Sequence, residues 1–134
     1  MLYLLDTNAI SDLMRGEPPI ERWLWSLPET SRVITSPIVR GEILYGILRT
    51  PGGKKKSALE ADAIRYFQLI PCEVLPQPVG DQYAALKFIR QTSGRSMDEN
   101  DLWIAATALA LGATLVTRDT DFNGIEGLAV LAIR

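Results

Sequence analysis

The chain has 134 residues, with 47% apolar and 22% charged side chains, a composition typical of one globular domain rather than of a disordered segment. Its net charge of −2 argues against a general nucleic-acid coat protein, which would be basic. The absence of histidine excludes Ser-His-Asp triads and most zinc sites, so any catalysis must use carboxylates, hydroxyls, lysine, arginine, the one thiol or a cofactor.

The sequence shows no sign of export or of membrane insertion. No run of residues approaches the roughly 20 apolar residues that span a bilayer, and no basic leader precedes Asp6. The single cysteine, Cys72, cannot form an internal disulfide and is compatible with a reducing compartment. We therefore expect a cytoplasmic protein with no membrane partner.

Short apolar runs alternate with helical segments along the chain. Strands are predicted at residues 2–5, 33–35, 73–75, 114–117 and 129–133. Helices are predicted at residues 8–14, 20–26, 37–49, 57–69, 79–91 and 100–111. This alternation predicts an α/β fold with a mostly parallel sheet of about five strands flanked by helices, in a single domain over residues 1–134.

Local signals mark several of the boundaries. Ser36 followed by Pro37 predicts a helix start, and Gly112 predicts a helix end. Ser96 and Glu99 have the spacing of a capping box before the last helix. The segment "GGKKK" at residues 52–56 is expected to be a flexible, basic loop.

Two predicted strands end in an aspartate. Asp6 follows the strand at 2–5, and Asp119 follows the strand at 114–117. The structural alternative for each is a turn residue or a helix cap, because aspartate is common in both places. In open α/β sheets, however, ligands bind at the carboxyl ends of the strands. If the two strands are neighbours, both carboxylates reach one crevice.

Two further acids lie in apolar helices. Glu42 is the only acid in the helix that begins at Pro37, and an ion pair with a nearby arginine is its structural alternative. Asp101 shares one helix face with Ile104 and Ala105, so it is expected at the buried end of that face. An unpaired buried carboxylate costs several kcal/mol, so it requires a cation or a proton.

The four acids together favour a metal site over four separate structural roles. Carboxylates that converge in one pocket repel one another unless a cation is present. A donor set made only of oxygen atoms suits Mg²⁺ or Mn²⁺. Such a site is typical of metal-assisted phosphodiester hydrolysis, which needs no nucleophile from the protein.

Four segments in chain order resemble the motifs of PIN-domain ribonucleases, most closely the VapC toxins of toxin–antitoxin pairs. They are "LLDTN" (4–8), "RGEILYG" (40–46), "NDLWIAATAL" (100–109) and "LVTRDTDF" (115–122). The resemblance spans residues 2 to about 131. It implies a three-layer PIN-like fold and Mg²⁺- or Mn²⁺-dependent endonuclease activity on RNA. It also implies a homodimer that a small cognate antitoxin holds inactive, with operator DNA bound only through the antitoxin.

The resemblance also assigns expected roles to individual residues. The acidic quartet of the family matches Asp6, Glu42, Asp101 and Asp119. Asp6 and Asp101 are then the expected direct metal ligands. Glu42 and Asp119 are expected to bind metal directly or through water and to orient the attacking water.

Three further residues are expected to support the quartet. Asn8 is expected to hold an acid by hydrogen bonding, and Thr117 to play a similar part just before the last acid of the quartet. Asp121 is expected in the outer shell of the site.

Two other functions are consistent with parts of the sequence. A metal-dependent phosphatase or phosphotransferase would use Asp6 as a nucleophile. That class usually has a second aspartate two residues on, where this chain has Asn8. A non-catalytic PIN-like interaction module is the other alternative, but such a module is expected to lack some of the acids, and all four are present here.

Overall fold

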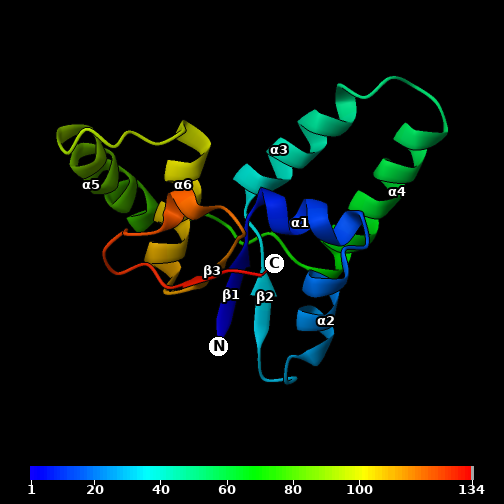
Figure 1. Ribbon diagram of the computed structural model, residues 1–134, viewed down its shortest axis with the longest axis horizontal. Helices are drawn as coiled ribbons and strands as arrows, with labels where there is room; N and C mark the ends of the chain where they lie inside the picture. The colour runs from blue at the N-terminus through cyan, green and yellow to red at the C-terminus, as the bar shows by residue number, and fades with distance from the viewer. Residues whose placement is uncertain (134) are drawn as a thin grey trace.

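The computed structural model describes residues 1–133 and, within them, contains one sheet of four parallel strands in the order β2-β1-β3-β4. The strands are β1 (Leu2–Leu5), β2 (Arg32–Ile34), β3 (Thr114–Val116) and β4 (Val130–Leu131). Leu4 in β1 pairs with Ile34 on one side and with Leu115 on the other. The two strands that end in an aspartate, β1 and β3, are therefore neighbours, as the proposed crevice requires (Figure 1).

The predicted fifth strand at residues 73–75 is wrong. This segment contributes only a parallel bridge between Cys72 and Thr35, with a hydrogen bond from the amide of Glu73 to the Thr35 carbonyl at 3.0 Å. Prolines at 71 and 76 bracket the segment, and proline lacks the N–H that a ladder needs. Val74 is 85% exposed, so its β-branched side chain reflects local propensity and not burial in a sheet.

Six α-helices and one 3-10 turn connect and follow the strands in the part of the chain that the structure describes. They are α1 (Thr7–Met14), α2 (Pro18–Ser26), α3 (Pro37–Leu48), α4 (Lys54–Leu69), α5 (Pro78–Thr92), α6 (Glu99–Leu111) and η1 (Thr120–Phe122). Gly112 ends α6 in the left-handed conformation, with a φ of 63°, as its position predicted. No helix within residues 1–133 has both the length and the apolar character that crossing a membrane requires.

Two boundary predictions are wrong. Lys54 to Lys56 form the first turn of α4, so the loop before that helix is shorter than the "GGKKK" segment. The capping box is also absent, because α6 begins at Glu99 and its N-cap residue is Asp98, which makes no side-chain cap hydrogen bond. The carboxylate of Glu99 turns instead toward α5, where the ammonium group of Lys87 lies 3.2 Å away.

The helices form two diverging pairs, α3 with α4 and α5 with α6, and α1 packs against the first pair (Figure 1). The central strands are covered on both faces, as is typical of parallel sheets, and Leu4 and Leu115 are fully buried. The small side chains of Ala105 and Ala108 are also fully buried on α6, which lets this helix approach the core closely. The space between the two pairs lies above the carboxyl ends of β1 and β3.

Candidate metal centre

Asp6 and Asp119 lie at the carboxyl ends of the two adjacent strands. Asp6 is 3% exposed and caps α1, because its Oδ1 accepts a hydrogen bond from the amide of Ala9 at 2.8 Å. Asp119 caps η1, where its Oδ1 accepts from the amide of Asp121 at 2.9 Å. Asp6 and Asp119 thus serve both as caps and as candidate site residues, because each cap holds its carboxylate at the end of a strand.

Thr117 connects these two aspartates. Its buried hydroxyl accepts a hydrogen bond from the amide of Asp119 at 2.9 Å and forms a hydrogen bond with the Asp6 carboxylate. Because a carboxylate only accepts, the Thr117 hydroxyl donates to Asp6. The threonine therefore contacts two acids of the predicted quartet.

Glu42 is held by a residue from α1. The Thr7 hydroxyl donates to Glu42 Oε1 at 2.6 Å, and the two residues are 35 positions apart in the sequence. This bond joins α3 to the helix that Asp6 caps. The structural alternative for Glu42, an ion pair with a nearby arginine, does not occur within residues 1–133.

Asp101 is the acid whose pKa is raised most. Burial, followed by the negative charges of four other acids, raises the pKa of Asp101 to about 7. Those acids, in order of decreasing effect, are Asp98, Asp119, Glu42 and Asp6. The N-terminal position of Asp101 in α6 favours a carboxylate, but burial and repulsion outweigh this effect. The structure thus places the other three acids of the predicted quartet near enough for their charges to act on Asp101.

The pKa of Asp6 is raised as well. Burial is the largest cause, and the charges of Asp119 and Asp12 add to it, so that the pKa of Asp6 rises to about 6. The hydrogen bonds from Thr117 and from the amide of Ala9 lower the pKa but do not cancel the rise. Two acids whose ionised forms are this costly need either a proton or a cation near neutral pH.

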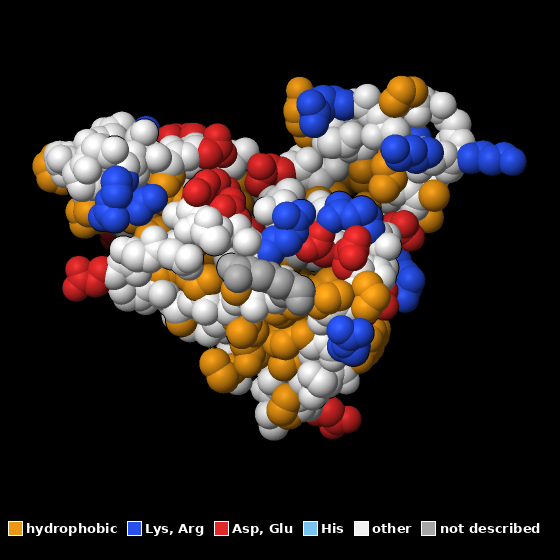
Figure 2. Space-filling model, viewed as in Figure 1, with side chains coloured by type: hydrophobic (Ala, Val, Ile, Leu, Met, Phe, Trp, Pro, Cys, Tyr) orange, Lys and Arg blue, Asp and Glu red, His pale blue; other side chains and the backbone are white. Residues whose placement is uncertain are grey.

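Asp121 lies closer to the quartet than the sequence indicated. Asp101, Asp119 and Asp121 each offer a carboxylate oxygen, and these three oxygens lie within 4.8 Å of one another. Figure 2 shows Asp and Glu side chains gathered where the two helix pairs meet. An all-oxygen, partly buried cluster in which the pKa of Asp101 is raised fits a hard divalent cation.

The predicted role of Asn8 has no hydrogen bond to support it. Within residues 1–133 the structure contains no hydrogen bond from the Asn8 side chain to an acid. The adjacent Thr7 makes such a bond instead, with Glu42. The only sequence signal for Thr7 was a hydroxyl residue directly after the aspartate at the strand end. The role of Asn8 therefore stays a prediction.

Replacing Thr7 by valine is expected to lower the affinity for divalent metal, or the activity, by about 10- to 100-fold, which is usual when an outer partner of a metal ligand is removed. The hydroxyl that orients Glu42 is lost while the volume of the side chain is kept. Isothermal titration with Mn²⁺ measures the effect. Thr92→Val is the control, because the Thr92 hydroxyl bonds only to carbonyls of its own helix. Equal affinities in the two variants would contradict a role for Thr7.

A parallel sheet whose strand ends and flanking helices bring carboxylates together defines an α/β protein that can bind a divalent cation at the carboxyl end of the sheet. The PIN domain family model matches residues 3–128, and the chain belongs to this family.

Named relatives cover almost the whole chain. Toxin FitB of Neisseria gonorrhoeae (strain ATCC 700825 / FA 1090) is 36% identical and aligns over 89% of this chain and 88% of its own. Ribonuclease VapC1 of Haemophilus influenzae (strain R2866) is 35% identical over 96% and 95% of the two chains. The crystal structure of VapBC2 from Rickettsia felis, bound to a DNA fragment from its promoter, matches with a TM-score of 0.91 at 26% identity, over all of both chains.

Proposed function

We propose that this chain is a metal-dependent endoribonuclease and the toxin of a toxin–antitoxin pair. The observation that carries the proposal is the gathering of acids around Asp101, where burial and the charges of Asp98 and of the other three quartet acids raise the pKa to about 7. Relatives named as a toxin and as a ribonuclease, both more than 30% identical to the chain, support the same function. Mg²⁺ or Mn²⁺ is the proposed ion, because every donor in the cluster is a carboxylate oxygen.

In this proposal the four acids have different roles. When bound, the divalent ion supplies positive charge against the charge that develops on the phosphate and lowers the pKa of water. Asp6 and Asp101 would hold the ion. Glu42 has Oε1 engaged by Thr7, so Oε2 is left to accept a hydrogen bond from the attacking water and orient it. Asp119 is held by Thr117 and would serve as the fourth acid of the site.

The alternative with Asp6 as a nucleophile fits the structure less well. A nucleophile must reach the phosphorus atom, whereas Asp6 is 3% exposed and its carboxylate accepts hydrogen bonds from Ala9 and Thr117. A non-catalytic module would have no use for acids whose ionised forms are this costly. The nuclease is therefore the function that we propose.

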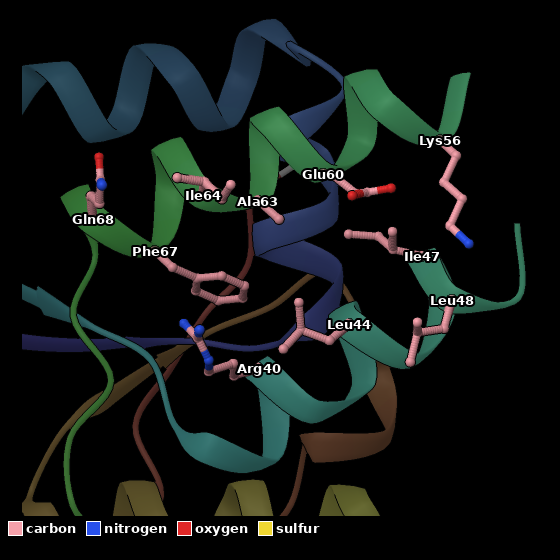
Figure 3. Close-up of a pocket in the computed structure, with 10 residues that line it drawn as sticks. All are labelled: Arg40, Leu44, Ile47, Leu48, Lys56, Glu60, Ala63, Ile64, Phe67 and Gln68. Atoms are coloured by element: carbon pink, nitrogen blue, oxygen red, sulfur yellow. The ribbon is translucent and has the colours of Figure 1, made fainter. Parts of the chain in front are cut away.

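The partner proposal is a small antitoxin protein. The R. felis structure named above is a VapBC complex on promoter DNA, and operator DNA would reach this chain only through the antitoxin. The chain has an exposed groove of about 690 Å³ between α3 and α4 that a protein partner can cover. Figure 3 shows Leu44, Leu48 and Phe67 on its apolar walls, and the guanidinium of Arg40 lies 4.9 Å from the centre of the Phe67 ring.

We also propose that the chain forms a homodimer. Its proposed substrate is cellular RNA, so its proposed place of action is the cytoplasm. Together these elements describe an RNA-cutting protomer whose partners are a second copy of itself and an inhibiting antitoxin. Only the purified chain, freed of any such inhibitor, tests the activity directly.

The purified chain is expected to cut RNA with Mg²⁺ or Mn²⁺ and not with EDTA, and Asp6→Asn is expected to abolish the cutting. Gel analysis of end-labelled RNA measures this, and circular dichroism checks that the variant is folded. Equal cutting by both proteins would indicate a contaminating nuclease. A folded chain that binds metal and cuts neither transfer, ribosomal nor messenger RNA would contradict the proposal.

A further inference from the structure

An ion-pair cluster built around a buried aspartate lies beside the acids and takes no part in the proposed chemistry. Asp12, on α1, is 9% exposed and pairs with two arginines, Arg15 and Arg118. The Nε of Arg118 donates to Asp12 Oδ2 at 3.0 Å, across 106 positions of sequence. Arg15 bonds the other oxygen of the same carboxylate. One buried aspartate thus orients two guanidinium groups.

Arg118 keeps most of its hydrogen-bonding capacity. Within residues 1–133, its Nη1 and Nη2 atoms make no hydrogen bond, and its side chain is 48% exposed. A guanidinium has five N–H donors in one plane, so a single bond at Nε sets that plane and leaves the two terminal nitrogens for another ligand. Arg15 is less available, because its Nε lies 3.8 Å from Glu17. The two arginines line the same hollow of about 320 Å³.

The position of Arg118 connects this hollow to the candidate metal centre. Arg118 lies in the chain between Thr117 and Asp119. Thr117 forms hydrogen bonds with Asp119 and with Asp6, two acids of the quartet. The charge of Asp12 acts on Asp6, which places the ion-pair cluster beside the quartet. Figure 2 shows Lys and Arg side chains next to acidic side chains on this face of the molecule.

We propose that Arg118, oriented by Asp12, binds a phosphate group of the RNA backbone next to the acidic quartet. This inference rests on the proposed function. A polyanion that approaches four carboxylates needs a cation close by, and the two terminal nitrogens of a guanidinium match two phosphate oxygens. Because Asp12 fixes the guanidinium before binding, little side-chain entropy remains to be lost on contact.

RNA binding tests this assignment without a need for cleavage. Fluorescence anisotropy measures the Kd of a fluorescein-labelled, mixed-sequence single-stranded RNA with Mn²⁺ present, in an Asp101→Asn background that the proposed function makes inactive. Adding Arg118→Ala is expected to raise the Kd about 10-fold and to reduce the slope of log K against log salt by about 1. Arg118→Lys keeps the positive charge but lacks the paired terminal nitrogens of the guanidinium, and it is expected to restore part of the affinity.

Two further variants separate this role from others. Asp12→Asn removes the orienting charge but keeps Arg118, so the expected Kd lies between those of the Arg118→Ala protein and its background. Arg32→Ala is the matched control, because Arg32 also pairs with a carboxylate, Glu73 at 2.6 Å, but lies at the start of β2, at the opposite end of the sheet. Arg32→Ala is expected to leave the Kd unchanged.

The possible results are distinct. An unchanged Kd in Arg118→Ala, with a loss of Mn²⁺ affinity or a lower Tm in the otherwise native chain, would overturn the proposal and make Arg118 structural. A 10-fold rise in Kd while the native chain binds RNA but never cuts it would support the proposal and contradict the nuclease. A native chain that does not bind RNA would overturn both.

Discussion

Replacing Asp101 by asparagine is expected to reduce RNA cleavage by about 10³-fold or more while making the metal-free protein more stable. The loss of activity corresponds to the several kcal/mol that a bound cation contributes to such a reaction. The gain in stability follows because burial and four neighbouring acids raise the pKa of Asp101 to about 7, so its ionised form is costly in the fold. Asparagine has nearly the same shape and no charge. The Asp101 carboxylate is thus needed for activity but destabilises the metal-free fold.

Single-turnover cleavage and thermal unfolding at pH 8 in EDTA measure the two effects, and the expected rise in Tm is roughly 2–5 °C. Asp121→Asn is the matched comparison, because Asp121 belongs to the same group of carboxylates but is exposed. We expect a smaller loss of activity from this variant, about 10- to 100-fold, and little change in Tm. A metal-free Asp101→Asn protein that is less stable than the native chain would contradict the electrostatic argument.

The metal-free protein is expected to lose stability as the pH rises through 6 to 7. The pKa values of Asp6 and Asp101 rise on folding, to about 6 and about 7, from an ordinary value of 3.8. The folded state therefore binds more protons than the unfolded state between these values. The stabilisation is fully present below about pH 3.8 and is lost as the pH passes the folded pKa values.

Urea unfolding in EDTA at a series of pH values from 5 to 8 measures the trend. The free energy of unfolding is expected to fall over this range, and the Asp101→Asn variant should show a shallower fall. Saturating Mn²⁺ is expected to reverse the slope, because the ion competes with protons for the same oxygens and binds only the folded chain. A metal-free stability that stays constant from pH 5 to 8 would show that the two acids are not coupled to folding as described.

The sequence determined those features that depend on neighbouring residues. The apolar runs predicted the ends of three strands to within one residue and those of the last, shorter strand to within two, and Gly112 marked the end of α6. The aspartates after two strands indicated a site because charge at the mouth of a buried strand needs a partner. Where a local pattern was ambiguous, the prediction failed. Residues 73–75 have strand propensity, but the flanking prolines limit them to one bridge.

Only the tertiary structure decided which distant groups meet. The pairing of β1 with β3 brings Asp6 to Asp119, and the Thr7–Glu42 and Asp12–Arg118 contacts join positions 35 and 106 residues apart. Local propensity and helical or strand periodicity carry no information about such pairs, because each contact depends on the order of strands in the sheet and on how the helices pack over it. The raised pKa values arise the same way, since burial and repulsion exist only once the chain has folded around its acids.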